Sequence, residues 1–343
     1  MGRAARSMII VTGAAGFIGA NLVAELLARG HRDLLAVDAF RSSGAGPGAP
    51  PAKTRYLDDL GVSARLDRGE LPDALNRFDA GRRVEVVFHL GACSDTTATD
   101  VDFMFANNLE YTRTLWHWCA QRAVPFVYAS SAATYGDGAQ GFDDECDPNR
   151  LKPLNLYGKS KHLFDLWALE QTVTPPRWAG LKYFNVYGPR ESHKGRMASV
   201  AFHAYRQVVE TGEVKLFRSH RPDIPDGGQL RDFVFVEDAV AATLHFWERP
   251  ESPNAPNGLY NVGTGTARSF ADLARAVFAA MDREPKIVYI PMPEDLRDKY
   301  QYFTQAANAK LRRAGFATPF RDIESGVWKY IEWLKRRPAA GER

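Results

Sequence analysis

Three evenly spaced glycines between a short apolar run and an amphipathic stretch constrain the fold most. Gly13, Gly16 and Gly19 follow residues 8–12, Met-Ile-Ile-Val-Thr, and open a segment with helical periodicity over 16–29. Small residues let the backbone of such a turn approach a pyrophosphate, and the helix that follows supplies unpaired N–H groups. The spacing differs by one position from the G-x-G-x-x-G fingerprint. The sequence therefore predicts a strand–turn–helix unit that binds a dinucleotide.

The first half of the chain continues the same rhythm, with short β-branched runs alternating with helical stretches. This alternation is typical of βαβ units in a parallel sheet. Further strands are expected at 33–38, 84–90, 125–130 and 180–184, and helices at 108–122 and 156–171. We therefore predict an α/β fold: a Rossmann-type, doubly wound parallel sheet over residues 8–184, to which about 232–262 and 303–315 return.

After residue 184 the rhythm stops, because Pro, Gly and Asp gather in 189–197 and 218–230. Such clusters are typical of loops. Helices resume at 269–281 and 320–334, so a smaller C-terminal α/β substrate lobe is expected from 185–231, 263–302 and 316–335. Three further expectations concern single segments: residues 231–236 rejoin the large sheet, 41–51 form a surface loop, and 1–7 form a disordered extension.

Composition narrows the function classes. The 343 residues are 45% hydrophobic and 25% charged, as in an ordinary globular protein. The net charge of +3 is too small to argue for nucleic acid or a membrane surface as partner. Three scattered cysteines indicate neither a disulfide scaffold nor a metal site. No apolar run approaches the ~18 residues that span a bilayer. A cytoplasmic protein is expected.

A second group of residues carries acid–base chemistry. Tyr157 and Lys161 are four residues apart in the expected helix 156–171, so they share one face. A lysine charge nearby would lower the pKa of the phenol, which would then accept a proton from an alcohol at neutral pH. Ser131 ends an expected strand, and strand carboxyl ends gather at the cofactor crevice. Together with the glycine turn, these side chains predict a dehydrogenase-type site.

The choice of dinucleotide depends on the end of the second strand. Asp38 lies there, nineteen residues after Gly19. An acidic residue at this position usually hydrogen-bonds the adenosine ribose and favours NAD. Arg41, Lys53 and Arg68 follow, and their charges would offset the repulsion of a 2′-phosphate. On these residues alone the cofactor is NADP or NAD.

These motifs resemble those of the extended short-chain dehydrogenase/reductase family, whose members modify nucleotide sugars. The similarity is greatest to the branch that epimerises C6″ of ADP-heptose, and it covers about residues 8–335. The motifs that carry it are Asn185-Val-Tyr-Gly-Pro-Arg-Glu-Ser-His-Lys194 and its continuation to His203, Gly91-Ala-Cys-Ser94, 128–136 and 303–306. The resemblance implies that tightly bound NADP oxidises C6″ to a transient ketone and returns the hydride to the opposite face. It also implies a homo-oligomer, often of five subunits, with ADP-heptose as substrate.

The same resemblance implies site residues. Tyr157 and Lys194 would be the two acid/base groups, aided by Ser131 and Lys161, and burial would lower the pKa of Lys194. Cofactor contacts would come from Gly13, Gly16, Phe17, Ile18, Gly19, Asp38, Ala39, Lys53, Arg68, Leu90, Gly91, Ala92, Cys93, Ser94, Asn107, Lys161 and Val186. Sugar-nucleotide contacts would come from Asn185, Arg196, His203, Phe217, Arg231 and Tyr300. Arg196 departs from the family pattern, because a small serine is usual there.

Other functions stay open at this stage. A UDP-hexose 4-epimerase would use the same catalytic groups. A 4,6-dehydratase is disfavoured, because Ala132 and Ala133 stand where that subgroup carries an acid pair. A non-catalytic dinucleotide sensor would share the fold, but such proteins commonly lack the Tyr/Lys pair.

Overall fold

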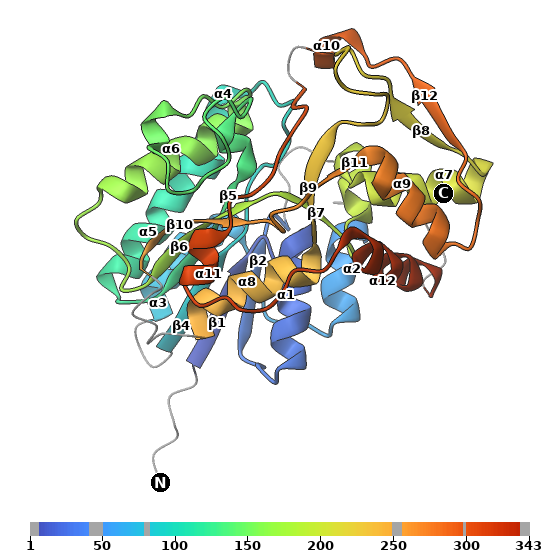
Figure 1. Ribbon diagram of the computed structural model, residues 1–343. Coiled ribbons are helices and arrows are strands. Elements are labelled where there is room, and N and C mark those ends of the chain that lie inside the picture. Colours follow the sequence, from blue (N-terminus) through green and yellow to red (C-terminus); the bar gives the residue numbers. More distant parts are fainter. Residues whose placement is uncertain (1–6, 41–50, 79–82, 249–255, 298–299, 337–343) are drawn as a thin grey trace.

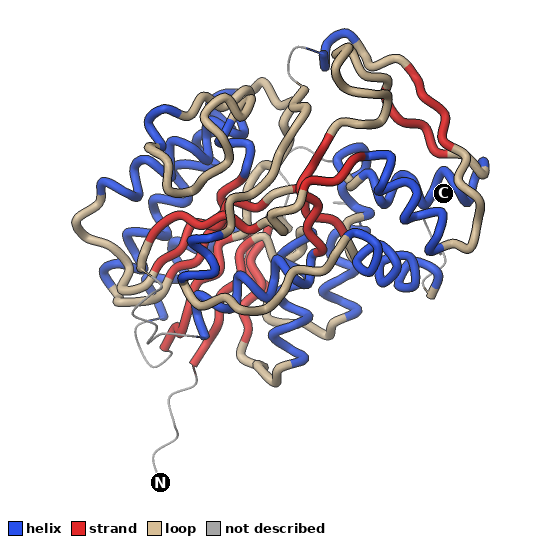
Figure 2. Tube along the Cα trace, viewed as in Figure 1, coloured by secondary structure: helices blue, strands red, loops and turns tan. Residues whose placement is uncertain are grey.

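A seven-stranded parallel sheet forms the centre of the protein (Figures 1 and 2). The computed structural model describes residues 7–40, 51–78, 83–248, 256–297 and 300–336, so nearly all of the expected extension 1–7 and loop 41–51 lies outside the described residues. The strand order is β10-β6-β5-β4-β1-β2-β3. The bounds are β1 (Ser7–Thr12), β2 (Leu34–Asp38), β3 (Arg65–Asp67), β4 (Arg83–His89), β5 (Phe126–Ser131), β6 (Trp178–Tyr183) and β10 (Gly258–Val262). The predicted doubly wound fold is confirmed.

The strand order reverses at β1, which pairs with β2 on one side and β4 on the other. In doubly wound sheets the ligand crevice lies beyond the carboxyl ends of the strands at this point. Thr12, His89 and Ser131 end β1, β4 and β5. The sheet therefore places these three residues along one edge.

Alternate residues of β1 face two different hydrophobic cores. Ile9 and Val11 pack with α1 (Phe17–Ala28) and α8 (Val236–Glu248). Met8 and Ile10 pack with the core on the opposite face, which α3 (Leu71–Arg77), α5 (Tyr111–Gln121) and α6 (Leu156–Glu170) complete. Burial on both faces explains why β1 is a continuous apolar run rather than an alternating one.

A third hydrophobic core belongs to a smaller lobe beside the main sheet (Figure 1). Its elements are α7 (Val200–Thr211), α9 (Phe270–Ala280), α12 (Ile323–Lys335) and the paired strands β8 (Val214–Phe217) and β12 (Ile287–Ile290). The remaining α-helices among the described residues are α2 (Pro51–Asp59), α4 (Val101–Phe105), α10 (Glu294–Arg297) and α11 (Ala309–Arg313). Within the described ranges no helix is long and apolar enough to cross a membrane.

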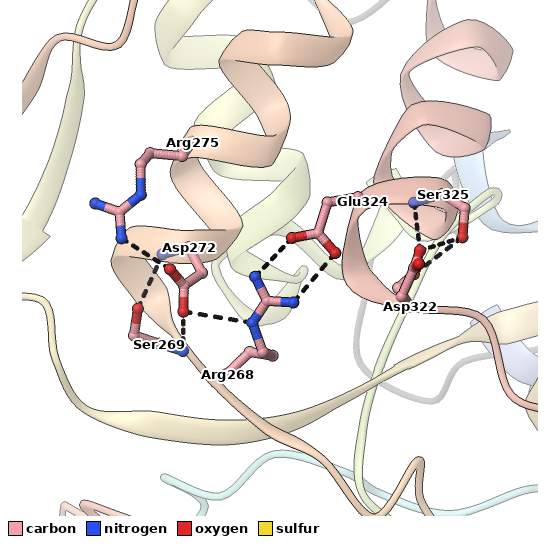
Figure 3. A network of polar contacts seen from close by, with 7 residues as sticks. All are labelled: Arg268, Ser269, Asp272, Arg275, Asp322, Glu324 and Ser325. Atoms are coloured by element: carbon pink, nitrogen blue, oxygen red, sulfur yellow. Dashed lines mark hydrogen bonds and ion pairs between the residues drawn. The ribbon is translucent and has the colours of Figure 1, made fainter.

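Polar contacts join the first turns of α9 and α12 in this lobe (Figure 3). Ser269 caps α9 in a reciprocal arrangement with Asp272, and Asp322 caps α12. Arg268 Nη2 lies 2.6 Å from Glu324 Oε1 and so connects the two helices. The groups are partly exposed, which limits an ion pair of this kind to about 1 kcal/mol. The caps and the apolar faces of the helices therefore hold the lobe together.

One expectation about the sheet is wrong. Residues 231–236 do not rejoin the large sheet, because β9 (Leu230–Phe235) pairs with β7 (Asn185–Tyr187) and β11 (Ala267–Ser269) in a separate three-stranded sheet. Phe233 and Phe235 enter the core of the small lobe, whereas Val234 enters the core of the large sheet. A strand buried on both faces has the same apolar pattern in either sheet, so its pattern alone does not assign it. The return of β10 to the large sheet agrees with the expectation, and the exact lobe boundaries stay a prediction.

Candidate active site

The glycine turn between β1 and α1 has no room for side chains. Gly13 has φ +68°, and a Cβ there would lie 2.6 Å from the Gly91 nitrogen. A Cβ on Gly19 would lie 2.0 Å from the Gly13 oxygen. Gly16 begins α1 without a side-chain cap, and the first turn of α1 has no acidic residue. Bare N–H groups at an uncompensated positive helix end fit a pyrophosphate, so these residues suit the cofactor that the sequence predicts.

Asp38 ties this turn to the end of β2. Its two oxygens accept hydrogen bonds from the Ala15 N–H at 2.9 Å and the Ala39 N–H at 2.8 Å. These two hydrogen bonds hold the end of β2 against the glycine turn. Asp38 pairs in register with Asp67, and Arg68 follows at the same end of β3. Arg68 thus lies at the same edge of the sheet as Asp38.

The predicted cofactor segment from Leu90 to Ser94 follows β4 and crosses the end of β1. The N–H of Leu90 donates to Thr12 O at 3.1 Å, and that of Gly91 donates to Thr12 Oγ1 at 3.2 Å. The Cys93 N–H donates to Asn108 Oδ1 at 2.8 Å. The segment, with Ala92 at its centre, therefore lies against the glycine turn. Of the other predicted cofactor residues, Ile18 lies in α1, Val186 in β7 and Lys53 in α2; the Lys53 side chain is outside the described part.

Asn108 is a hub that the sequence analysis missed. It lies in a π-helical turn (Ala106–Glu110) between α4 and α5, where one continuous helix was expected. Its Nδ2 donates to Cys93 O at 2.9 Å and to Ser160 Oγ at 3.0 Å, and the Ser160 hydroxyl donates to Tyr157 O at 2.8 Å. The neighbouring Asn107 donates to Asn108 Oδ1. Two consecutive asparagines inside a helical pattern were the available signal, since Asn competes with helical hydrogen bonding and π turns are frequent at functional sites.

His89 is buried beneath the same edge, between two threonines. Thr112 Oγ1 donates to Asn108 O at 2.7 Å, so at 2.9 Å it accepts the proton of His89 Nε2. His89 Nδ1 then accepts from Thr12 Oγ1 at 2.6 Å. Burial, together with the Lys161 charge, lowers the pKa of His89 to about 3. His89 is therefore a neutral structural link between β1, β4 and α5.

The structure brings together Tyr157 and Ser131, as the sequence predicted. Asn155 caps α6 by accepting from the Gly158 N–H at 2.8 Å, which puts Tyr157 in the first helical turn. A Cβ on Gly158 would lie 2.8 Å from Ala133 O, so this glycine lets α6 approach the turn after Ser131. A side-chain hydrogen bond joins Ser131 to Tyr157.

The expected direction of the Tyr157 pKa shift is wrong. Burial raises the pKa of Tyr157, and the hydrogen bond from Ser131 only partly offsets that rise. Lys161 is 4% exposed, and burial lowers its pKa to about 8, although the Asp165 charge acts in the opposite direction. Desolvation by the surrounding protein therefore determines the pKa of Tyr157 more than the charge of Lys161 does. Residue spacing in the sequence does not reveal desolvation.

Lys194 lies in the turn Ser192–Met197, which the dinucleotide domain holds in place. Asn21 of α1 donates to Pro189 O at 2.8 Å, and the Tyr56 hydroxyl of α2 lies 2.6 Å from Ser192 Oγ. The Lys194 ammonium lies 5.3 Å from the centroid of the Phe17 ring. Burial lowers the pKa of Lys194, in the predicted direction, while Glu191 raises it. No direct contact joins Lys194 to Tyr157 in the part of the chain that the structure describes.

The predicted sugar-nucleotide residues are only partly brought together. Arg231 is 6% exposed and lies between the rings of Tyr300 and Phe270, at 5.1 and 5.5 Å from their centroids. Burial lowers the pKa of Arg231. An aromatic clamp of this kind fixes a guanidinium for an anionic group.

The other residues of this set come from other elements. Asn185 begins β7, His203 lies in α7 beside Phe202, and Phe217 ends β8. Arg196 is exposed, and its charge helps lower the pKa of Asp95. Among the described residues, no hydrogen bond, ion pair or ring contact joins Asn185, His203 and Phe217 to one another. Their convergence on a substrate stays a prediction.

Comparisons with known proteins agree with this geometry. The family described as "NAD dependent epimerase/dehydratase family" matches residues 9–263. Curated ADP-L-glycero-D-manno-heptose-6-epimerases from Nitratidesulfovibrio vulgaris and Fusobacterium nucleatum are 48% and 44% identical to this chain over 94% and 95% of its length, and 97% of each relative is covered. The crystal structure of the Helicobacter pylori ADP-L-glycero-D-manno-heptose-6-epimerase has 29% identity and a TM-score of 0.75, with 96% of this chain and 97% of that chain covered.

Proposed function

The chain belongs to the NAD dependent epimerase/dehydratase family, and we propose that it interconverts ADP-D-glycero-D-manno-heptose and ADP-L-glycero-D-manno-heptose by inverting C6″. Relatives of that name at 44% and 48% identity support the substrate. They also favour it over a UDP-hexose 4-epimerase. A dinucleotide sensor is disfavoured, because Tyr157, Lys161 and Ser131 are all retained.

One observation carries the mechanism: the pKa values of Tyr157 and Lys194 are shifted in opposite directions, upward for the phenol and downward for the amine. When two titratable groups are shifted apart in this way, one is suited to donate a proton and the other to accept one. The two groups lie on different elements, α6 and the turn Ser192–Met197. Inversion of a carbinol carbon needs such a pair, because the hydroxyl proton is lost on one side of the sugar and regained on the other.

In one direction of the reaction Lys194, as the neutral amine, accepts the C6″ hydroxyl proton, and Tyr157 donates its proton to the ketone oxygen once the sugar presents its other face. In the reverse direction the roles exchange. Ser131 stabilises the substrate oxygen beside Tyr157 by a hydrogen bond, and the buried Lys161 charge favours the phenolate whenever Tyr157 has lost its proton. The hydride exchange at C6″ is the chemistry that the nicotinamide dinucleotide supplies when bound.

We infer that this dinucleotide is NADP rather than NAD. Both oxygens of Asp38 already accept backbone N–H groups, which reduces its demand for a ribose hydroxyl. Arg68 follows β3 at the same edge and supplies a charge suited to a 2′-phosphate. Lys53 in α2 is proposed to supply a second one. A cytoplasmic location and a homo-oligomer of five subunits stay predictions.

The function is tested by incubating the purified protein with ADP-D-glycero-D-manno-heptose and following the C6″ epimers by NMR. Both epimers should approach equilibrium with no net consumption of NADP. Turnover of UDP-glucose or UDP-galactose with no action on ADP-heptose would overturn the substrate assignment and leave the fold and the dinucleotide site intact.

A further inference from the structure

A buried ion pair lies behind the catalytic side chains and has no part in the mechanism above. Lys182 Nζ is 2.8 Å from Asp165 Oδ2, and the two side chains are 2% and 0% exposed. Asp165 lies in α6, one helical turn beyond Lys161 and two beyond Tyr157. Lys182 lies in β6, next to β5 in the sheet. The pair therefore joins the helix that carries Tyr157 to the sheet that carries Ser131.

The same two residues also hold the end of β5. Ser130 Oγ donates to Asp165 Oδ2 at 2.6 Å. Lys182 Nζ donates to Thr134 Oγ1 at 2.7 Å, and that hydroxyl donates to Ser131 O at 2.8 Å. Thus Asp165 fixes the residue before Ser131, whereas Lys182 fixes the carbonyl of Ser131 itself. Together the two residues fix the main chain around Ser131.

Asp165 accepts three hydrogen bonds and Lys182 donates two, all with buried partners. Asp165 Oδ1 accepts from the Tyr128 hydroxyl at 2.9 Å, and the Lys182 ammonium lies 5.1 Å from the centroid of the Tyr135 ring. Ser130, Thr134 and Tyr128 are at most 2% exposed. Several buried hydrogen bonds that share two charged groups make such a network rigid. Sequence spacing gave no sign of it, because Lys182 lies in a different element.

We propose that Asp165 and Lys182 act as one positioning unit, which holds the Ser131 hydroxyl against Tyr157 and keeps a negative charge beside Lys161. The inference rests on the proposed oxidation and reduction of an alcohol at this site. It does not depend on which sugar nucleotide is bound.

The charges around Lys161 explain the second part of that role. Asp165 faces Lys161 from the same helix and raises its pKa, against the larger effect of burial. His89 faces it from β4 but is neutral, because its own pKa is lowered to about 3. Tyr157, which faces Asp165 and Cys93, is also neutral, because its pKa is raised. Among the described residues Asp165 is therefore the negative charge that keeps the buried Lys161 ammonium protonated.

A purely structural role is the competing explanation. Removing one partner of a buried ion pair usually destabilises a protein strongly, whereas replacing both partners is often neutral. A loss of activity in a single variant would therefore decide nothing. The double variant Asp165→Asn with Lys182→Met removes both charges of the pair, so neither partner is left as an unpaired buried charge, and it separates stability from positioning.

The experiment measures thermal unfolding, kcat, KM and the pH dependence of kcat for wild type, both single variants and the double variant. The double variant should unfold near the wild-type temperature, with KM little changed and kcat lowered at least about tenfold, a loss within reach of small misplacements of catalytic groups. The alkaline limb of the pH profile of its kcat should move to lower pH, because without Asp165 the Lys161 ammonium loses its proton at a lower pH. A double variant with the wild-type kcat and pH profile would overturn the proposal.

Two additions keep that result unambiguous. Asp238→Asn is the matched control, because Asp238 is 4% exposed, pairs with Arg321 and lies in α8 outside the site. This variant should lower the unfolding temperature and leave the pH profile of kcat unchanged. The titration of Lys161, followed by NMR in lysine-labelled protein, needs no substrate. Its midpoint should fall in Asp165→Asn even if ADP-heptose proved to be the wrong substrate, whereas an unchanged midpoint would contradict the electrostatic role.

Discussion

The Lys194 ammonium lies 5.3 Å from the centroid of the Phe17 ring, so the turn that follows β7 contacts the first residue of α1 directly after the glycine turn. Asn21 and Tyr56 anchor the same turn to α1 and α2. These contacts tie the position of Lys194 to the dinucleotide domain, while Glu191 before the turn bonds Ser199, the cap of α7 in the smaller lobe. In the proposed mechanism, the opposite pKa shifts at Lys194 and Tyr157 suit the amine to accept a proton and the phenol to donate one.

Tyr157→Phe should lower kcat at least about 10²-fold, the low end of the contribution of a general acid or base. The variant keeps the ring and loses only the hydroxyl that bonds Ser131, so dinucleotide binding should persist. Steady-state assay and cofactor content provide the measurement. Tyr289→Phe, in β12 of the smaller lobe, is the control and should retain activity. Wild-type turnover by Tyr157→Phe would remove the phenol from the mechanism.

Lys53→Ala should weaken NADP binding more than NAD binding, because only NADP carries the 2′-phosphate. Isothermal titration of the cofactor-free protein with each dinucleotide measures the difference. Lys329→Ala serves as control, since Lys329 is exposed on α12 and pairs with Glu237. Equal losses for both dinucleotides would return Asp38 to its usual role of selecting NAD.

His89 predicts a pH dependence of stability. Its pKa is about 3 in the folded protein, because of burial, against an ordinary value of 6.5. Between pH 6.5 and 3, His89 therefore binds a proton in the unfolded chain but not in the folded protein. The free energy of unfolding falls as pH decreases through this range, by up to about 1.4 kcal/mol per pH unit. Denaturant unfolding of wild type and His89→Gln across this range isolates the effect. Parallel pH profiles for the two proteins would show that His89 does not contribute it.

The sequence alone was sufficient to predict the features that depend on a repeating pattern or on a fixed spacing of residues. The βαβ alternation predicted the doubly wound sheet, and the Gly13, Gly16 and Gly19 spacing predicted a turn without room for side chains, which the structure confirms. Tyr157 was predicted on one helix with Lys161, and its hydrogen bond to Ser131 follows from the strand ends meeting at one edge.

The features that were missed depend on contacts between distant segments. β9 has the pattern of a buried strand, but only its partners β7 and β11 show which sheet contains it. Desolvation of Tyr157 reversed the expected shift of its pKa, since burial is a property of the whole packed site. Asn108, and the Asp165–Lys182 pair, act through partners from 15 to 52 residues away along the chain. The spacing of neighbouring residues in the sequence does not reveal such partners.

Lys194→Met tests the central claim, that two groups on different elements exchange protons with C6″. The substitution keeps an unbranched apolar side chain at this position and removes the amine. The measurement is turnover of ADP-heptose by protein shown to retain its dinucleotide. The account predicts a fall in kcat of at least about 10²-fold, as for Tyr157→Phe; turnover close to that of the wild type would contradict it.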